Sequence, residues 1–343
     1  MPSYTYPEAA ELELIAQDLL PRLEEQRVVF DFFPTEVTDA FYVRWEQRDN
    51  YIGLQQVRGL NGEPPKVKRV GLKSYQMAPG VYGEFVLLDE EELTTRRGPG
   101  TWAAAIDVSD LVAEAQEQLL QRELDRIEWI IWTLLTTGTF SVSGVDNAVI
   151  HTDAYTTLTF SAGTPWATFA TATPLANFRT VGLNSRGRSS AYNASATAYM
   201  NRVTFNNMIS NTNTNDLAGR RTSGLNTVLN LEEVNKVLLG GDLPAVVVYD
   251  QGYLDETSTF QPWIPNAKVV VVGARPNNRP VGVYKLTRNV NAEGGGGGGS
   301  GRYVRVIDGG AENDDPPRKI RVHRGHSGGP ALLYPGAVTT MSV

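Results

Sequence analysis

The sequence predicts an α+β fold, and three observations support this prediction. Residues 107–137 repeat apolar positions close to a 3.6-residue period, as a long amphipathic helix does. Continuous apolar runs at 245–249 and 268–272 are typical of strands buried in a sheet. Shorter helical patterns occur at 196–209 and directly after Asn230. Helices mixed with buried strands in this way indicate an α+β domain.

The first quarter of the chain predicts one helix and a ribbon. Residues 7–20 form an amphipathic pattern with acidic side chains early, and Pro21 is expected to end or kink that helix. Residues 41–60 lack a helical period and predict extended segments and turns. Residues 66–75 and 81–89 predict a β-hairpin with a basic first arm. Because an isolated ribbon is marginally stable, it is either an edge of a larger sheet or an arm lying on another molecule.

The helix predicted over 107–137 is the strongest local pattern. Asp107 is placed to cap its amino end, and Gly138 is a typical stop. Roughly thirty residues at ~1.5 Å each would make a rod of about 45 Å. Its second face mixes acidic and basic side chains. We therefore expect one buried face and one wet or shared face.

The second half of the chain predicts further elements in order. The run NTNTND at 211–216 is expected to be a loop, because Asn and Asp side chains compete for the backbone. Asn230 and Glu233 have the spacing of a capping box at a helix start. The glycine tract within 293–301 predicts a flexible loop or linker. Strands are then expected at 302–307, 319–323 and 331–334.

Composition excludes several kinds of chemistry. The 343 residues contain no Cys and only three His, which removes disulfides and thiolate sites and disfavours a histidine metal centre. The formal net charge of −7 argues against a general nucleic-acid binder, which needs a basic face. Four acidic residues among the first twenty predict that no signal peptide is present, and no apolar run is long enough for a membrane span. Neither a metal nor a cofactor is expected.

One string invites an enzymatic hypothesis. GHSGGP at 325–330 resembles the sequence around the nucleophile of chymotrypsin-like serine proteases, with Ser327 as the nucleophile. That chemistry needs a His base and an acid that orients it, but His323 and His326 lie too close in sequence. We therefore interpret the string as a Gly-Gly-Pro turn between two strands. The paired carboxylates of Asp255 and Glu256 are interpreted as a solvated charge run.

The order of these elements resembles the HK97-type fold of tailed-phage major capsid proteins. Three strings narrow the resemblance to the lambda-like capsid protein E family. They are WTLLTTGTFSVSG at 132–144, ATAYMNRVTFNNMISN at 196–211 and AVVVYDQGYLDETSTFQPWIPNAKVVVV at 245–272. The third is the most specific, since a Tyr-Asp strand and an aromatic-Ile-Pro turn lead into a Val-rich strand. The resemblance covers nearly the whole chain.

The resemblance implies a structural subunit and not an enzyme. Its expected parts are an N-terminal arm (1–42), an extended β-hairpin E-loop with its flanking segments (43–98), a P-domain with the spine helix (99–185), an A-domain with a central sheet (186–285), and C-terminal strands returning to the P-domain (286–343). The chain would then assemble as pentamers and hexamers into the icosahedral head of a tailed double-stranded DNA bacteriophage.

Within this interpretation, five residues are the candidates for intersubunit contacts: Lys66, Lys68, Arg69, Lys73 and Tyr75. The partners expected are further copies of the chain, scaffold and portal proteins, a decoration protein, and packaged DNA bound without sequence specificity. The expected location is the capsid of the virion, after synthesis in the host cytoplasm. Two alternatives stay open at this point. One is an encapsulin-like compartment shell with the same fold, and the other is a serine hydrolase that uses Ser327.

Overall fold

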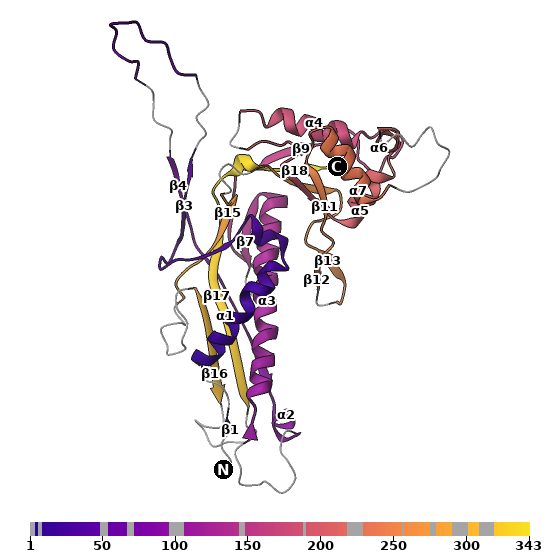
Figure 1. The fold of residues 1–343 in the computed structure, drawn as a ribbon. Coiled ribbons are helices and arrows are strands. Elements are labelled where there is room, and N and C mark those ends of the chain that lie inside the picture. The colour runs from indigo at the N-terminus through magenta and orange to yellow at the C-terminus, as the bar shows by residue number, and fades with distance from the viewer. Residues whose placement is uncertain are drawn as a thin grey trace. The chain divides into compact units, whose positions relative to one another are not determined.

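The computed structural model describes residues 4–5, 9–48, 54–66, 72–95, 106–143, 148–187, 190–217, 229–255, 257–274, 279–289, 301–308 and 319–343. The chain divides into two compact units, whose elements are labelled in Figure 1. The first unit comprises 1–44, 76–129 and 283–331, and the second comprises 45–75, 130–282 and 332–343. Neither unit is one continuous segment, because the chain passes from one to the other several times.

In these ranges the helices are α1 (Ala9–Glu25), α2 (Glu90–Thr95), α3 (Ser109–Thr137), α4 (Pro174–Asn184), α5 (Arg202–Ile209), α6 (Thr212–Leu217) and α7 (Leu231–Gly240), with short 3₁₀ turns at Val28–Asp31 and Pro335–Ala337. The strands are β1 (Tyr4–Thr5), β2 (Thr35–Val37), β3 (Val43–Arg48), β4 (Leu72–Met77), β5 (Gly80–Leu88), β6 (Ile106–Asp107), β7 (Thr139–Ser143), β8 (Val149–Ala154), β9 (Leu158–Ser161), β10 (Thr197–Met200), β11 (Ala245–Val248), β12 (Gly252–Leu254), β13 (Phe260–Pro262), β14 (Lys268–Val272), β15 (Gly282–Leu286), β16 (Arg302–Asp308), β17 (Ile320–Leu332) and β18 (Val338–Ser342).

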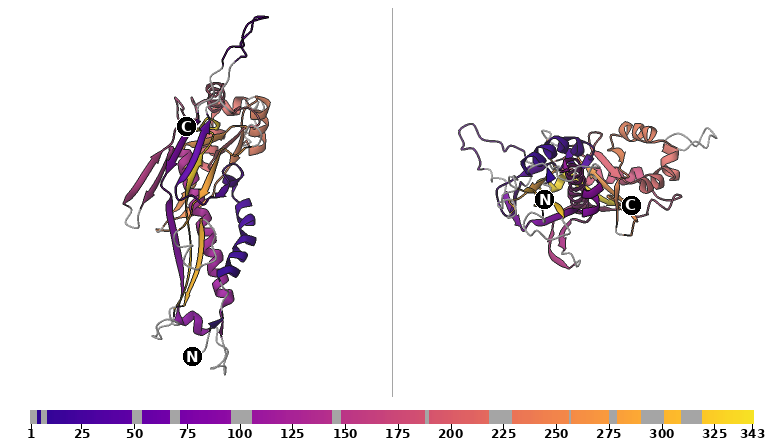
Figure 2. Two further views of the ribbon diagram at one scale, coloured as in Figure 1. Left: turned by 90° about the vertical axis from the view of Figure 1, so that its left-hand side faces the viewer. Right: turned by 90° about the horizontal axis from the view of Figure 1, so that it is seen from below.

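The sheet of the first unit is built around β17. This strand pairs antiparallel with β16 and with β5, and its other neighbour β15 pairs in parallel with β2. Helices α1 and α3 lie on one side of these strands (Figure 2, left). Leu12 of α1 and Val112 of α3 join Val304 of β16 and Val322 of β17 in one buried apolar cluster. The core of this unit therefore lies between the two helices and one face of the sheet.

The second unit contains a five-stranded sheet in the order β11-β10-β14-β18-β9. Side chains from α4, α5 and α7 share one apolar cluster with one face of β10 and β14, where Met200 and Val269 are buried. The last turns of α3 cover the other face, since the Trp132 ring meets the rings of Tyr199 and Tyr249 at 5.7 Å. Strands covered on both faces read as continuous apolar runs, which is the pattern seen in the sequence.

Several sequence predictions are confirmed. The long helix is α3, whose 29 residues end at Thr137 and are followed by Gly138, a residue with φ of +74°. Asp107 accepts hydrogen bonds from both the backbone N–H and the hydroxyl of Ser109, at the amino end of this helix. The capping box of α7 is present, with Asn230 and Glu233 each bonded to the other's backbone N–H. The predicted apolar strands are β11 and β14.

The predicted hairpin between 66–75 and 81–89 is wrong. β4 pairs with β3, whereas all nine residues of β5 pair with β17. Each of the two strands forms its ladder with a strand distant in sequence, so the short link Ala78–Pro79 does not turn the chain back on itself. The ribbon of this region is therefore β3–β4, and β5 belongs to the sheet of the first unit.

Two local predictions in the second unit are also corrected: the helix at 196–209 is confirmed only over 202–209, and the loop at 211–216 is wrong. The helical pattern at 196–209 is strand β10 followed by α5, because β11 and β14 supply backbone partners on both sides of β10. Asn201 ends the strand and caps α5 by accepting from the Thr204 N–H. The predicted loop at 211–216 is helix α6. Asn211 caps it by accepting from the Asn213 N–H, so the asparagine that was expected to break a helix starts one.

At the N-terminus, the predicted end of the helix at Pro21 is wrong, since α1 continues to Glu25. Its last turn is held from outside the helix. The Thr35 hydroxyl donates to Glu24 at 3.2 Å, and Arg302 approaches the same carboxylate at 3.9 Å. These tertiary contacts compensate for the backbone hydrogen bond that proline cannot donate.

The predicted Gly-Gly-Pro turn is wrong as well, because β17 runs without a break from Ile320 to Leu332. Glycine is needed in this strand for close approach. A Cβ on Gly325 would lie 2.8 Å from the Cα of Gly83 on β5, and a Cβ on Gly328 would lie 2.9 Å from the Tyr284 ring. The predicted glycine loop of 293–301 falls outside the described residues, apart from Gly301.

The close packing of β17 gives a stability prediction. Gly325→Ala should destabilise the fold by about 1–3 kcal/mol, because its methyl group meets backbone atoms that cannot move aside. Gly163→Ala is the matched control, since no atom lies within 4 Å of its Cβ position. Urea unfolding of both variants measures the difference, and equal free energies of unfolding would contradict the packing argument.

Candidate functional site: an exposed arm and a buried charge network

The ribbon β3–β4 carries an exposed segment of chain, residues 54–66 (Figure 1). Every described side chain of this segment is exposed. Three of them are apolar: Leu54 is 95% exposed, and Val57 and Leu60 are each 97% exposed. Single exposed apolar residues are normal on a protein surface, but three on one short segment indicate an interaction site. We call residues 43–77 the arm and residues 54–66 its tip.

The base of the arm is tightly held within the second unit. Trp45 of β3 lies between two parallel rings, with Tyr75 at 5.4 Å and Tyr155 at 5.5 Å between ring centroids. The Gln47 side chain donates a 3.0 Å hydrogen bond to the Leu332 carbonyl. Burial raises the pKa of Tyr155 well above its usual value. The arm therefore has a buried, well-packed root and an apolar, solvent-exposed tip.

The predicted contact residues fall on this arm. Lys66 is the last described residue of the tip, and Lys73 and Tyr75 lie on β4, all three exposed. Tyr75 has one ring face on Trp45, so it also has a role within the chain. Lys68 and Arg69 lie outside the described residues. That the five residues contact another subunit stays a prediction.

Sequence reasoning missed the apolar residues of the tip. It concentrated on the basic residues of the supposed hairpin and read 41–60 only as extended segments. A signal was present, because Leu54, Val57 and Leu60 recur at three-residue intervals in a stretch of otherwise polar residues and glycines. Their exposure could not be predicted, since it depends on β4 pairing with β3.

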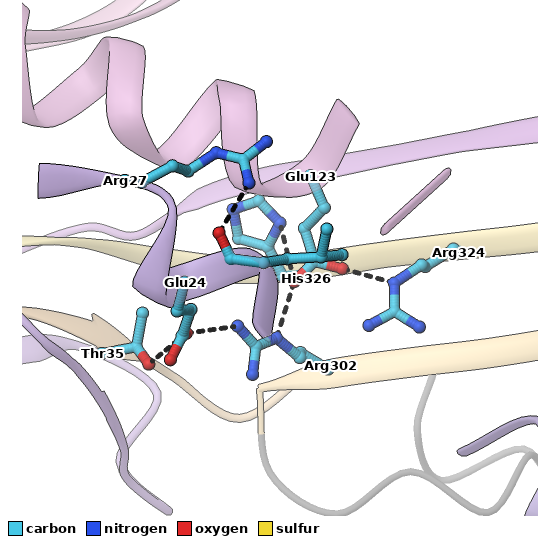
Figure 3. Close-up of polar contacts among 8 residues, drawn as sticks. Glu24, Arg27, Thr35, Glu123, Arg302, Arg324 and His326 are labelled. Carbon is cyan, nitrogen blue, oxygen red and sulfur yellow. Dashed lines mark hydrogen bonds and ion pairs between the residues drawn. The ribbon is translucent and has the colours of Figure 1, made fainter. Parts of the chain in front are cut away.

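The first unit contains a buried network of charges centred on Glu123 of α3 (Figure 3). Arg302 of β16 donates to one of its carboxylate oxygens at 2.6 Å, and Arg324 of β17 donates to the other at 2.6 Å. His326 of β17 places its Nδ1 3.9 Å from the same carboxylate and its Nε2 3.2 Å from the Tyr284 hydroxyl. One carboxylate therefore connects the long helix to two strands.

The network extends to the end of α1. Arg302 also approaches Glu24, and Arg27 pairs with two acids of α3, Asp125 at 2.6 Å and Glu128 at 3.4 Å. Charge-assisted hydrogen bonds of this kind are stronger and more directional than neutral ones. They fix the position of both helices along the sheet of this unit.

The pKa values of Glu123 and His326 determine which groups of the network are charged. Burial alone would favour the protonated acid, but Arg302 and Arg324 hold the pKa of Glu123 at about 2. Burial is also the main effect on His326 and lowers its pKa to about 4, with Glu123 acting against it and the arginines reinforcing it. At neutral pH the carboxylate is thus charged, and the imidazole is neutral.

The structure places Ser327 poorly for nucleophilic chemistry. The side chain is buried in the middle of β17. Because successive strand residues face opposite sides of a sheet, His326 points to the Glu123 side and Ser327 to the other. The protease-like string is accounted for by the packing of its glycines.

Within the described residues, no group of three or more His, Asp or Glu side chains is placed to hold a metal ion. No helix in those ranges combines the length and apolar character of a membrane span.

Comparison with known proteins shows which family and which solved structures this chain resembles. A sequence model for phage major capsid protein E matches residues 27–281, well over half of the chain. No match was found among curated protein sequences. A protein described as a prophage capsid protein from E. coli CFT073 shares the fold, with a TM-score of 0.54 and 14% identity over 96% of this chain and 98% of that one.

Two further solved structures are similar to different degrees. A phage-related protein from Bordetella bronchiseptica RB50 has a TM-score of 0.53 and 11% identity, covering 96% of each chain. An encapsulin complex from Synechococcus elongatus PCC 7942 reaches a TM-score of 0.47 and 9% identity over 93% of this chain and 86% of that one. The first supports the fold, and the second is too distant to support an argument.

The buried carboxylate gives a stability prediction. Glu123→Gln keeps the shape of the side chain but leaves the buried Arg324 guanidinium without a counter-charge and Arg302 with only Glu24 at 3.9 Å, which should cost about 3–5 kcal/mol in the free energy of unfolding. Glu84→Gln is the matched control, because Glu84 pairs with Arg122 at the surface and should cost about 0–1 kcal/mol. Chemical denaturation compares the two, and equal losses would contradict the importance of the network.

The lowered pKa of His326 gives a prediction about pH. The unfolded chain takes up this proton near the ordinary pKa of 6.5, whereas the folded chain does so only near pH 4. The contribution of a neutral His326 is therefore fully present above about pH 6.5 and is lost as the pH falls toward 4. His326→Gln should reduce the loss of stability across that window by on the order of 1–3 kcal/mol in urea titrations. His151→Gln, outside the network, should keep the wild-type loss, and a variant His326→Gln with an unchanged loss would refute this assignment.

Proposed function

This chain belongs to the phage major capsid protein E family and is a bacteriophage major capsid protein with the HK97-type fold, and we propose that its arm lies on a neighbouring subunit of the shell. Such proteins self-assemble into shells, and the location is the capsid of the virion. The observation that supports the arm proposal best is the exposure of Leu54, Val57 and Leu60.

An exposed apolar tip on a well-anchored root suits this role. Complete burial of a Leu or Val side chain stabilises an interface by about 1.5–3 kcal/mol. The stacked Trp45 and the hydrogen bond from Gln47 keep the root ordered, so less conformational freedom is lost when the tip docks. The gain is repeated at every copy of the chain in a shell.

Basic residues would orient the docked arm. Lys66 and Lys73 are exposed, and Lys68 and Arg69 occur between them in the sequence. With a net charge of −7, acidic side chains outnumber basic ones on every neighbouring copy. Charged residues at the rim of an interface set its register and the rate of encounter more than its affinity.

The family supports a fuller assignment of parts. We assign residues 1–42 to an N-terminal arm, 43–98 to the E-loop with its flanks, 99–185 to the P-domain, 186–285 to the A-domain and 286–343 to strands that return to the P-domain. The A-domain assignment is supported by one apolar cluster that joins α5 and α7 with β10, β11 and β14; α4, in the segment assigned to the P-domain, packs in the same cluster. In the proposed shell the chain forms pentamers and hexamers, because the arms adjust while these cores stay rigid.

The remaining partners follow from the same assignment. They are scaffold and portal proteins, a decoration protein, and packaged double-stranded DNA bound without sequence specificity. The net negative charge would keep the shell from binding that DNA tightly. The role is structural, with synthesis in the host cytoplasm and no catalytic step assigned to Ser327.

Assembly of the expressed protein tests the arm. Leu54→Asp, Val57→Asp and Leu60→Asp together should abolish closed shells, because the tip loses its apolar surface and gains charge. Negative-stain microscopy should show uniform shells for the unsubstituted chain and only free subunits or capsomers for this triple variant.

The matched control uses three polar residues of the same tip. Gln55→Asp, Gln56→Asp and Asn61→Asp add the same charge, but the apolar side chains remain. This variant should still form shells. Normal shells from the apolar triple variant would overturn the role of the tip, and a small monomer with no assembly from the unsubstituted chain would count against the proposed shell.

A further inference from the structure

The short hairpin β12–β13 of the second unit presents an apolar pair to solvent. Leu254 and Phe260 are direct partners in the antiparallel register, so their side chains share one face of a two-stranded ribbon. They are 66% and 50% exposed. We call this hairpin, residues 252–262, the finger.

The finger is ordered by its own contacts. The Asp255 carboxylate at its tip accepts hydrogen bonds from the backbone N–H groups of Thr257 and Thr259, the Thr257 hydroxyl and the Gln261 amide. These bonds, with the Thr257 hydroxyl foremost, lower the pKa of Asp255 to about 2, so the tip carries a negative charge. At the base, Tyr253 stacks on the buried Trp263 at 5.4 Å. An exposed apolar pair on a hairpin held by these contacts is well suited to binding.

The same unit contains a hollow of about 580 Å³ next to the end of α4. Leu183, Tyr192 and Leu243 supply its apolar surface. Arg179 and Arg186 also line it, together with Asp242, which accepts from the Ala194 N–H. Neither arginine side chain makes an ion pair or hydrogen bond within the part of the chain that the structure describes. The volume lies within the ~300–1,000 Å³ of typical binding clefts. We call this hollow the α4 pocket; it suits apolar side chains that carry a negative charge beside them.

Within the unit, the finger and the pocket lie at opposite ends of strand β11. β10 and β11 run parallel, and the pocket residues 190–193 and 242–243 directly precede them. The finger follows the other end of β11, and Figure 1 shows it on the far side of this strand from α4. The finger therefore does not fill the pocket of its own chain. The apolar and charged groups of that pocket are available to the finger of another copy.

We propose that the finger of one copy occupies the α4 pocket of the next copy, with Leu254 and Phe260 against its apolar surface and Asp255 near Arg179 and Arg186. The contact joins two different surfaces, so it repeats head to tail and closes into a ring when the rotation between copies allows it. It rests on the proposed function, since it describes how neighbouring subunits of a capsomer meet.

A chain without cysteine allows a direct test by crosslinking. Leu254→Cys combined with Leu183→Cys should give a disulfide ladder in assembled shells, from dimers up to full rings, on non-reducing gels. The control pair Leu254→Cys with Val149→Cys uses another exposed apolar residue, on β8, and should stay monomeric under the same oxidation. Shells of the first pair without crosslinks would overturn the proposal, and dimers alone would overturn its head-to-tail form.

Charge gives a second test that does not depend on cysteine geometry. Leu254→Lys with Phe260→Lys places positive charge against two arginines and should raise the critical concentration for assembly by roughly tenfold or more. Leu254→Glu with Phe260→Glu should do less harm, although the same apolar surface is lost. Adding Arg179→Glu and Arg186→Glu should rescue the lysine variant. The proposed contact would be contradicted if the lysine and glutamate variants had equal assembly defects, or if the arginine substitutions did not rescue the lysine variant.

These outcomes separate the two proposals. If the unsubstituted chain forms shells but crosslinks and charge rescue fail, only the finger contact is refuted. If the unsubstituted chain forms no shells, the failure belongs to the proposed function.

Discussion

The carboxylate of Glu123 is the constraint on which the first unit depends. It lies on α3 and receives one guanidinium from β16 and another from β17, with the neutral His326 beside them. Charges buried this deeply are tolerated only when each has its partner in good geometry. These pairs therefore fix the position of α3 along β16 and β17, because a shift of the helix by a single turn would separate Glu123 from both arginines. The packing of α1 follows, because Glu24 approaches Arg302 of this network and Arg27 pairs with Asp125 and Glu128 of the same helix α3.

The arm and the finger, the two exposed elements of the second unit, are built in the same way. The arm and the finger each have a root ordered by stacked aromatic rings, around Trp45 and Trp263, and each exposes apolar side chains that the chain itself does not cover. Ordering the root during folding leaves less entropy to be lost in association. A shell subunit benefits in particular, because a modest gain at each contact is repeated over many copies. In the proposed contacts, the root of each element is therefore already ordered when the subunit folds.

Prediction from sequence succeeded where one segment determines its own structure. The periodicity of α3, the capping box at Asn230 and the Val-rich β14 depend on neighbouring residues, and all three are confirmed. It failed where a distant partner decides. The two strands of the supposed hairpin pair with different strands, β3 and β17. The first part of the predicted helix at 196–209 is strand β10, which lies between β11 and β14. The string that resembles a turn lies within the continuous strand β17. The Glu123 network was missed because its members are some two hundred residues apart.

The sequence by itself determined the α+β class, the long helix, the absence of cysteine chemistry and the family resemblance, since these reside in local periodicity, composition and the order of motifs. Only the tertiary structure decided which strands pair, which charges are buried and which apolar residues stay in solvent. The reason is physical. Pairing and burial are properties of two segments brought together, and a residue such as Leu54 or Leu254 reads as core in any one-dimensional pattern until the fold leaves it without a partner.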